Sequence, residues 1–359
     1  MSAQPYYADD AVTLHHGDAL ALPLVDATVD LVVTSPPYFG LRSYRDGGEH
    51  YAGQIGSEAT PAEFVDALIS ATAEMMRVLK PSGSIWVNLG DKYAGRSLLG
   101  LPWRYAIRCI DELGLTLRSE VIWSKAGKGF IDARASDRMR RTHETWFHLT
   151  RSTHYFHSSD VRVPAANATE RPQRIRAEEL FAAAGLTPEH RSAIRAVGII
   201  DSKGAAVRSG GRWGSASGAL AAEARSHLGS YYREFCGGTN NSLMPPSVLT
   251  VPVGSFKVPK GADVTDHFAA FPMEWPSVFI RGWSPIGGVV LDPFGGTGTT
   301  ALVARVLGRR GVYVDLSTDY CRLAQWRVND PGQIASAMQV EKVATPMDDQ
   351  GVFDFGSVA

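Results

Sequence analysis

An apolar run that stops at two consecutive prolines limits the fold of this chain more than any other feature. Val29–Val33 is rich in β-branched residues and predicts a buried strand of a parallel sheet. Pro36 and Pro37 follow closely, and because proline donates no backbone hydrogen bond, the strand must end there in a rigid turn. In open α/β sheets, ligands bind at the carboxyl ends of strands, so this turn is a candidate site.

The turn offers groups that suit a planar ring with an exocyclic amino group. Ser35 supplies a hydroxyl, the proline carbonyls can accept hydrogen bonds, and Tyr38 supplies an aromatic face. The oxygen atoms would accept from the amino N–H groups while the tyrosine ring stacks on the ligand. For the two prolines alone, an ordinary strand-ending turn is the alternative interpretation.

A second strand and turn lie far downstream. The apolar run Val289–Leu291 ends at Asp292, and a helix is predicted over Thr299–Leu307. The turn between them is rich in glycine, which allows a tight turn and a close approach of the backbone to a ligand; its glycines are Gly295, Gly296 and Gly298. The next strand, Val312–Val314, ends at Asp315, whose carboxylate could accept two ribose hydroxyls.

The rest of the chain outside residues 158–250 alternates between strand and helix patterns, which predicts an α/β fold. A helix is expected to begin at Pro61, with Thr60 as its N-cap and Glu63 at capping-box spacing. The further strands are expected at Val12–His16, Ser84–Leu89, Leu117–Trp123 and His143–Leu149. The further helices are expected at Pro102–Leu113, Trp275–Gly282 and Tyr320–Val328.

Composition excludes several classes of protein. The chain has 359 residues, of which 44% are hydrophobic and 20% charged, so it can bury a sizeable core. It contains no apolar run long enough to span a membrane, and residues 1–10 do not resemble a signal peptide. Cys109, Cys236 and Cys321 lie far apart without CxxC spacing, which indicates a reducing compartment and argues against structural zinc. His143-Glu144 also lacks the second histidine of an HExxH zinc motif, so no metal is expected.

Charge is distributed unevenly. The net charge is −1, yet residues 125–235 have a balance of +7 and the remainder a balance of −8. A basic segment within an acidic scaffold is typical of an insert that binds a polyanion, although an unevenly charged solvated surface would look the same.

Two motifs resemble those of a known family. Ser35-Pro36-Pro37-Tyr38 resembles the catalytic motif of the DNA amino-methyltransferases, and residues 291–300 resemble their S-adenosylmethionine loop. Because the catalytic motif precedes the cofactor loop, the chain is similar to the circularly permuted β group. The serine form of the motif is similar to that of enzymes that methylate N4 of cytosine, whereas adenine enzymes more often carry Asp or Asn at this position.

The resemblance implies a mostly parallel seven-stranded sheet of the S-adenosylmethionine-dependent methyltransferase (Rossmann-like) fold, with strand order 3-2-1-4-5-7-6. It implies direct transfer of a methyl group from S-adenosylmethionine to an amino nitrogen of a flipped base in double-stranded DNA, at Ser35, Pro36, Pro37 and Tyr38. The residues expected to bind the cofactor are Asp18, His267, Phe271, Asp292, Phe294, Gly295, Gly296, Gly298, Thr299 and Asp315. For Asp18, a role confined to starting its own turn is an equal alternative.

The domain organisation follows from these motifs. We expect a catalytic half at residues 11–157, a target-recognition insert at 158–250, a cofactor-binding half at 251–330 and a polar tail at 331–359. Sequence-specific readers need arginines that reach guanine edges and phosphates. The expected DNA contacts lie in a loop after the catalytic turn and in a Gly- and Ser-rich stretch of the insert: Arg42, Arg45, Lys203, Arg208 and Arg212. A cytoplasmic enzyme is expected, and a cognate restriction endonuclease and the oligomeric state stay open.

Three other functions compete with N4-cytosine methylation. N6-adenine methylation would use the same fold. A NAD-dependent oxidoreductase is suggested by the GxGxxA match that begins at Gly296 and by the position of Asp315. A DNA-binding protein without catalysis is the third. The Asp292-Pro293-Phe294 prefix and the intact catalytic turn favour the methyltransferase.

Overall fold

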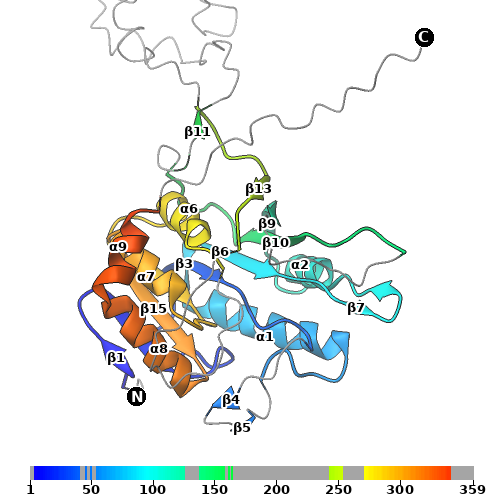
Figure 1. The fold of residues 1–359 in the computed structure, drawn as a ribbon, viewed down its shortest axis with the longest axis horizontal. Coiled ribbons are helices and arrows are strands. Elements are labelled where there is room, and N and C mark those ends of the chain that lie inside the picture. Colours follow the sequence, from blue (N-terminus) through cyan, green and yellow to red (C-terminus); the bar gives the residue numbers. More distant parts are fainter. Residues whose placement is uncertain are drawn as a thin grey trace, which may run out of the picture. The chain divides into compact units, whose positions relative to one another are not determined.

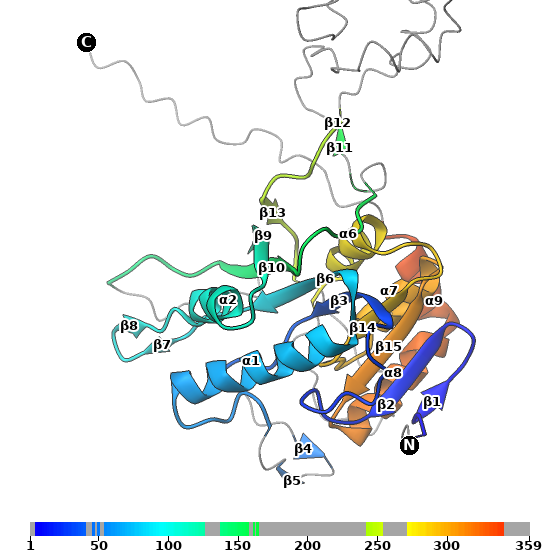
Figure 2. The same ribbon diagram turned by 180° about the vertical axis from the view of Figure 1, so that it is seen from behind.

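The structure is a computed structural model, drawn in Figure 1 and from behind in Figure 2. Only the backbone is described for four dipeptides, at 45–46, 49–50, 163–164 and 242–243. The described residues as a whole are 4–40, 45–46, 49–50, 54–125, 137–157, 161, 163–164, 242–253 and 271–340.

A nine-stranded sheet forms the centre of the described part of the chain, in the order β1-β2-β15-β14-β3-β6-β10-β9-β13. All neighbouring strands from β2 to β6 are parallel, whereas β10 runs antiparallel to both of its neighbours. The seven longer strands are β2 (Val12–His16), β15 (Arg310–Asp315), β14 (Val289–Asp292), β3 (Val29–Thr34), β6 (Leu79–Leu89), β10 (His143–Thr150) and β9 (Thr116–Ser124). The edges carry β1 (Tyr7–Ala8) and β13 (Val248–Thr250).

The sheet confirms the expected fold and strand order. When the strand before the glycine-rich turn, β14, is counted first, the seven longer strands follow the order 3-2-1-4-5-7-6. The short strands β1 and β13 extend the two edges and were not expected. Two strands as far apart in sequence as β3 and β14 therefore lie side by side in the middle of the sheet, where Leu31 is paired with Val290.

Alternation along the strands places the core on both faces of the sheet. In β3, Val32 packs on one face with helices α1 (Pro61–Val78) and α2 (Leu101–Asp111). Leu31 and Val33 pack on the other face, with helices α6 (Glu274–Trp283) and α7 (Thr299–Val306). Figure 1 shows α1 and α2 at one side of the sheet and α6 and α7 at the other. Helix α8 (Thr318–Asn329) packs on the α7 face, over β2 and β15.

The start of α1 follows the sequence prediction. The Thr60 hydroxyl accepts from the Glu63 N–H at 3.2 Å, and the Glu63 carboxylate accepts from the Thr60 N–H at 2.9 Å. This capping box satisfies two N–H groups that the helix leaves without intrahelical partners.

Several element boundaries differ from the prediction by a few residues, and three of the differences have a clear physical cause. β6 begins at Leu79, directly after α1, because Leu79 already pairs with Val29 of β3; the register then shifts, and the pairing resumes at Ser84. α2 ends at Asp111, and Gly114 reverses the chain two residues after the Glu112 cap, with φ 64°. The predicted tail begins with a helix, α9 (Pro331–Met338), because Asp330 caps it by accepting from Gln333 N–H at 2.9 Å and Ala337 is buried.

The chain divides into two compact units, residues 1–161 with 245–359, and residues 162–244. In the second unit the described elements are β11 (Val163–Pro164) and β12 (Ser242–Leu243), which pair with each other. At the borders of the first unit, β13 pairs with β9, and Val161 fills the space beside Gly282, where a Cβ would lie 2.8 Å from the valine. The assignment of the second unit to target recognition stays a prediction. Within the described residues, no helix has the length and apolar character that crossing a membrane requires.

Candidate active site at the carboxyl edge of the sheet

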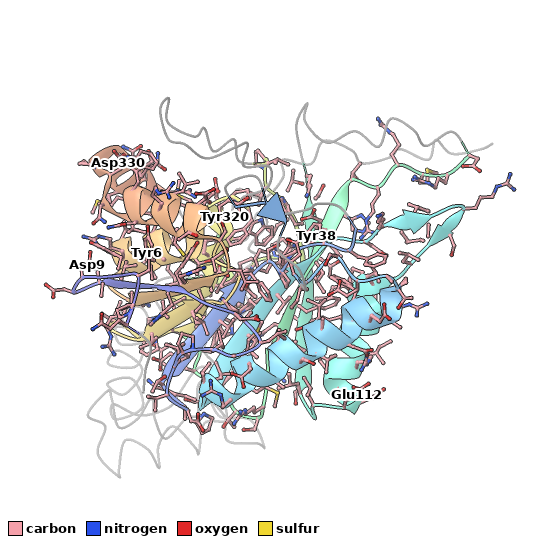
Figure 3. All side chains as sticks on the ribbon, turned by 90° about the horizontal axis from the view of Figure 1, so that it is seen from below. Tyr6, Asp9, Tyr38, Glu112, Tyr320 and Asp330 are labelled. Atoms are coloured by element: carbon pink, nitrogen blue, oxygen red, sulfur yellow. The ribbon has the colours of Figure 1, made fainter. Side chains whose placement is uncertain are left out.

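Both sequence motifs lie along one edge of the sheet. β3 ends at Thr34, β14 at Asp292 and β15 at Asp315, so the residues that follow these parallel strands share the carboxyl edge. β10 runs in the opposite direction, and its first residues therefore reach the same edge. In the view of Figure 3, Tyr38 lies near the middle of the molecule, between α8 and α1.

Asn88, at the end of β6, holds two residues of the Ser-Pro-Pro-Tyr turn. The Ser35 hydroxyl donates to Asn88 Oδ1 at 3.3 Å, and the Tyr38 hydroxyl donates to the same oxygen at 2.6 Å. The Asn88 amide donates in turn to the Thr145 carbonyl at 3.3 Å, which fixes its orientation. Because the Ser35 proton is directed at Asn88, the lone pairs of the serine oxygen are left to accept a hydrogen bond from a ligand.

The Tyr38 ring is held by close packing and through its hydroxyl. Gly90 lies so close that a Cβ there would be 2.6 Å from the ring, well inside van der Waals contact. The Tyr38 hydroxyl also lies 2.8 Å from Glu144 Oε2, the second acceptor for its single proton. Glu144 forms an ion pair with Lys125, and the two side chains are only 8% and 9% exposed. A buried carboxylate needs such a partner, because desolvation of an unpaired charge is costly.

Sequence reasoning missed Asn88, Glu144 and Lys125 as site residues. Asn88 and Glu144 are polar residues within strands that are otherwise buried, and they are only 1% and 6% exposed. A polar residue in an apolar strand pattern is the signal that could have identified them.

The Asp292 carboxylate joins the two motifs. It accepts from the Thr34 hydroxyl at 2.6 Å, from the Thr300 hydroxyl at 2.9 Å and from the Phe294 N–H at 3.2 Å. Burial raises the pKa of Asp292 to about 6, although these three hydrogen bonds favour the charged form. Asp292 therefore connects the end of β3, the glycine-rich turn and the first turn of α7.

The backbone of the glycine-rich turn has a conformation that depends on its glycines. A Cβ on Gly295 would lie 2.0 Å from the Tyr313 ring, so only glycine fits there. Gly296 and Gly298 have φ of 49° and 75°, in the left-handed region that favours glycine. A Cβ on Gly296 would come no closer than 4.0 Å to any described neighbour, so this side of the turn leaves room for a ligand.

Thr299 begins α7 and is held by a buried arginine. Arg327 Nη1 donates to the Thr299 hydroxyl at 2.8 Å and to the Thr297 hydroxyl at 2.7 Å. Burial lowers the pKa of Arg327 to about 10, so the side chain stays charged at neutral pH. These hydrogen bonds attach the glycine-rich turn to α8, the helix that carries Arg327.

Asp315 is oriented by two backbone groups. Its carboxylate accepts from the Gly296 N–H at 2.8 Å and from the Ser317 N–H at 2.9 Å. The carboxylate thus lies directly beside the glycine-rich turn. Asp18 follows the neighbouring strand β2 and accepts from the Leu20 N–H at 2.9 Å, which is the local turn role named above as its alternative.

The structure describes only part of the predicted site. Phe271 packs edge-on against Trp146, with ring centroids 5.5 Å apart, and Phe294 is partly buried against the core. Of the predicted DNA contacts, Arg45 is described by its backbone alone, in the hairpin of β4 (Arg45–Asp46) and β5 (Glu49–His50). The other predictions lie outside the described residues: His267, Arg42, Lys203, Arg208 and Arg212. Among the residues that the structure does describe, no cluster of His, Cys, Asp and Glu is arranged to hold a metal ion.

Known proteins match this chain over most of its length. The sequence profile of the DNA methylase family N6_N4_Mtase matches residues 29–326. The type II methyltransferase M.XycI of Xanthomonas campestris pv. cyanopsidis is 28% identical, over 91% of this chain and 90% of the relative. The type II methyltransferase M.PvuII of Proteus hauseri is 24% identical, over 91% and 86% of the two chains.

A solved structure is similar as well. The PvuII DNA methyltransferase, described as cytosine-N4-specific, matches with a TM-score of 0.58 and 20% identity, over 93% of each chain. These matches confirm the family resemblance and the fold that were inferred from the two motifs.

Proposed function

We propose the following activity for this chain, which belongs to the N6_N4_Mtase family of DNA methylases: it methylates the exocyclic N4 of cytosine in double-stranded DNA. The family's methyl donor is S-adenosylmethionine. The observation that carries the choice of cytosine is the serine at position 35, because the serine form of the motif is similar to that of enzymes that methylate N4 of cytosine. The similarity to a cytosine-N4-specific methyltransferase over nearly the whole chain supports the same choice.

The residues around the glycine-rich turn fit the cofactor. The open side of Gly296 leaves room for it, and the Asp315 carboxylate is fixed next to that side. We assign Asp315 as the residue that binds the ribose hydroxyls. The turn from Asp292 to Thr299 would contact the rest of the nucleoside and the methionine moiety. When bound, S-adenosylmethionine supplies an electrophilic methyl group.

The catalytic turn makes the amino nitrogen of the base reactive. The nitrogen lone pair of cytosine is delocalised into the ring and is a weak nucleophile. The Ser35 hydroxyl oxygen and the Pro36 carbonyl accept hydrogen bonds from the two amino N–H groups, which holds the nitrogen and favours the tetrahedral geometry of attack. Asn88 keeps the serine proton away from the base, so the serine oxygen acts as an acceptor.

Tyr38 positions the ring of the flipped cytosine. Its ring is fixed by Gly90, Asn88 and Glu144 before any base enters, so little conformational entropy is lost when a base stacks on it. Stacking of a base on an aromatic side chain contributes about 1–3 kcal/mol. The buried pair of Glu144 and Lys125 stabilises this arrangement.

The product identifies the target atom. DNA from cells that express the protein would be digested to nucleosides and analysed by mass spectrometry, with modification-sensitive sequencing to find the recognition sequence. N4-methylcytosine is the expected product. N6-methyladenine without N4-methylcytosine would overturn the assignment to cytosine and leave the DNA methylase family intact.

A biological role follows from the relatives that are type II methyltransferases. We infer that the enzyme acts on DNA in the cytoplasm and protects it from a restriction endonuclease with the same recognition sequence. Methylated DNA should then resist an endonuclease that cuts the sequence found by sequencing, whereas unmethylated DNA is cut. Cleavage of both samples at equal rates would contradict the protective role.

A further inference from the structure

A methionine with unusual exposure lies shortly before β10, whose first residues reach the active-site edge. Met139 is 92% exposed, the highest value among the large hydrophobic residues in the described part of the chain. It lies within Arg138-Met139-Arg140-Arg141, in the segment that leads into β10. Single exposed apolar residues are common on protein surfaces, so the surroundings of this residue decide its meaning.

Two of the flanking arginines hold the segment against the active-site edge. The Arg138 guanidinium lies 3.6 Å from the centroid of the Tyr93 ring, in the hairpin of β7 (Tyr93–Ala94) and β8 (Ser97–Leu98). Arg141 forms an ion pair with Asp91, with Nη1 3.2 Å from Oδ2. Asp91 is itself fixed, because its carboxylate accepts from the Gly100 and Leu101 N–H groups at the start of α2, both at 3.1 Å.

Short stretches of chain connect the segment to residues that contact Tyr38. Met139 precedes Glu144 by five residues, and Glu144 contacts the Tyr38 hydroxyl. An extended chain of that length spans at most about 18 Å. The Arg138 anchor, Tyr93, lies three residues beyond Gly90, which contacts the Tyr38 ring. Met139 is thus presented to solvent between the Arg138 and Arg141 anchors, in a segment that leads directly to Glu144.

The chemistry of the segment matches one partner, duplex DNA. Arg138 and Arg141 are engaged within the protein, whereas Arg140, beside Met139, is exposed, and its charge favours the phosphates of DNA. When a base leaves the stack, it leaves a gap, and apolar side chains such as Met can enter between base steps. Methionine suits this task because its unbranched, polarizable side chain adapts to irregular space.

We propose that Met139 enters the duplex beside the target cytosine and fills the space that the flipped base leaves. This inference rests on the proposed function, because it requires a base to be flipped into the Tyr38 site. Met139 is therefore a positioning residue for the DNA and does not contact the reacting nitrogen.

The test compares Met139→Ala with Met139→Leu on two DNA duplexes that carry the recognition sequence found by sequencing. In one duplex the target cytosine is paired with guanine, and in the other it faces an abasic site, so that it flips at little cost. The readouts are kcat/KM for methyl transfer and binding of S-adenosylmethionine measured by calorimetry. Met338→Ala is the matched control, because Met338 is 66% exposed on α9 and belongs to no part of the site.

Met139→Ala is expected to lower kcat/KM on the paired duplex by about 10- to 100-fold, since unstacking a base step costs a few kcal/mol. On the abasic duplex, kcat/KM of Met139→Ala should be reduced by less than about threefold. Met139→Leu should recover most of the methyl-transfer activity on both duplexes. Cofactor binding and the control should match the wild type. Equal deficits on the two duplexes, or no deficit on the paired one, would overturn the proposal. If the wild type methylates no cytosine on either duplex, the proposed function fails instead.

Discussion

The Thr34 hydroxyl donates a 2.6 Å hydrogen bond to the Asp292 carboxylate, across 258 residues of sequence. Thr34 ends the strand before the catalytic turn, and Asp292 ends the strand before the cofactor turn. Both residues are almost completely buried, at 0% and 2% exposure. The Asp292 carboxylate therefore joins the two halves of the site. Its buried surroundings disfavour its charged form.

Asp292→Asn should change how stability depends on pH. Burial raises the pKa of Asp292 from 3.8 to about 6, so the folded state binds the proton more tightly than the unfolded chain does. The stability that this proton contributes is complete below pH 3.8 and is lost as the pH rises through 6. Relative to the wild type, Asp292→Asn should gain up to about 3 kcal/mol between pH 4 and pH 7.5.

Urea denaturation at several pH values measures this difference. Thr300 can adapt to an asparagine because its hydroxyl also lies 3.2 Å from the Val33 carbonyl, which could accept its proton. Thr34→Val is the companion variant: it should destabilise the wild type by about 1.5–3 kcal/mol at pH 7.5 and Asp292→Asn by less. A difference between Asp292→Asn and the wild type that is constant across this pH range would show that Asp292 does not titrate as described.

Asp315→Ala should weaken S-adenosylmethionine binding by about 1.5–3 kcal/mol, the range for hydrogen bonds to a charged group. Calorimetry with a folded variant measures the affinity. Because Asp315 also orients the Gly296 and Ser317 N–H groups, Ser317→Ala serves as the control for changes at the start of α8. Unchanged affinity in Asp315→Ala would place the ribose elsewhere.

Ser35→Ala should slow the chemical step by about 10²–10³, the range for loss of one preorganised polar contact. Single-turnover methyl transfer measures that step, and cofactor affinity should not change. Asn88→Ala should slow the step as well, since it releases both Ser35 and Tyr38. The two substitutions should couple by roughly 0.5–3 kcal/mol in the double variant. Strictly additive effects would mean that Asn88 does not act through Ser35.

Gly90→Ala should displace the Tyr38 ring, because the added Cβ would lie 2.6 Å from it. If stacking on Tyr38 contributes about 1–3 kcal/mol, methyl transfer should fall by roughly 5- to 150-fold. Gly332→Ala on α9 is the matched control, since its nearest neighbour would be the Asp330 side chain at 3.2 Å, away from the site. Normal activity of Gly90→Ala would indicate that the ring position seen here is not the one used with DNA.

His148 should make the fold sensitive to acid. The ring is buried, stacks on Trp86 with centroids 4.3 Å apart and lies 3.0 Å from the Ser84 hydroxyl. Burial lowers the pKa of His148 from 6.5 to about 3, so stability is complete above pH 6.5 and is lost as the pH falls towards 3. The loss should approach about 1.4 kcal/mol per pH unit in this window.

The double variant His148→Phe with Ser84→Ala tests this because it removes the titrating ring and its polar partner together. Replacing both partners of a buried hydrogen bond by apolar groups often leaves the free energy of unfolding nearly unchanged. Below pH 6 the double variant should unfold at higher urea concentration than the wild type, with a difference that grows as the pH falls. Parallel stability curves for the two proteins would refute the assignment.

Much of the fold could be predicted because local signals agree with it. The apolar runs at Val29–Val33 and Val289–Leu291 are short, β-branched and bounded by proline or glycine, and both are central strands. The capping box at Thr60 and Glu63 likewise marks the start of α1 within the sequence itself. Helix α9 was missed because it has only eight residues and Ala337 alone is buried, so the segment is too short to show a clear helical period of apolar residues.

The site was harder to predict because its contacts cross the sheet. Asn88 and Glu144 lie 50 and 106 residues from Tyr38, and nothing near either residue in sequence shows that they meet there. Glu144 reaches the edge only because β10 runs against its neighbours. The family resemblance supplied the motifs, whereas the residues that hold those motifs depend on strand register and required the structure.

The borders of the second unit have a practical consequence. Val161 is seated beside Gly282, and β13 is hydrogen-bonded to β9, so the chain is anchored in the first unit before residue 162 and after residue 244. Glu144 is equally secured, since β10 pairs with strands on both sides. If residues 162–244 read the target sequence, as the sequence predicts, they form a cassette: exchanging them between relatives should alter which sequence is methylated without rebuilding the chemistry.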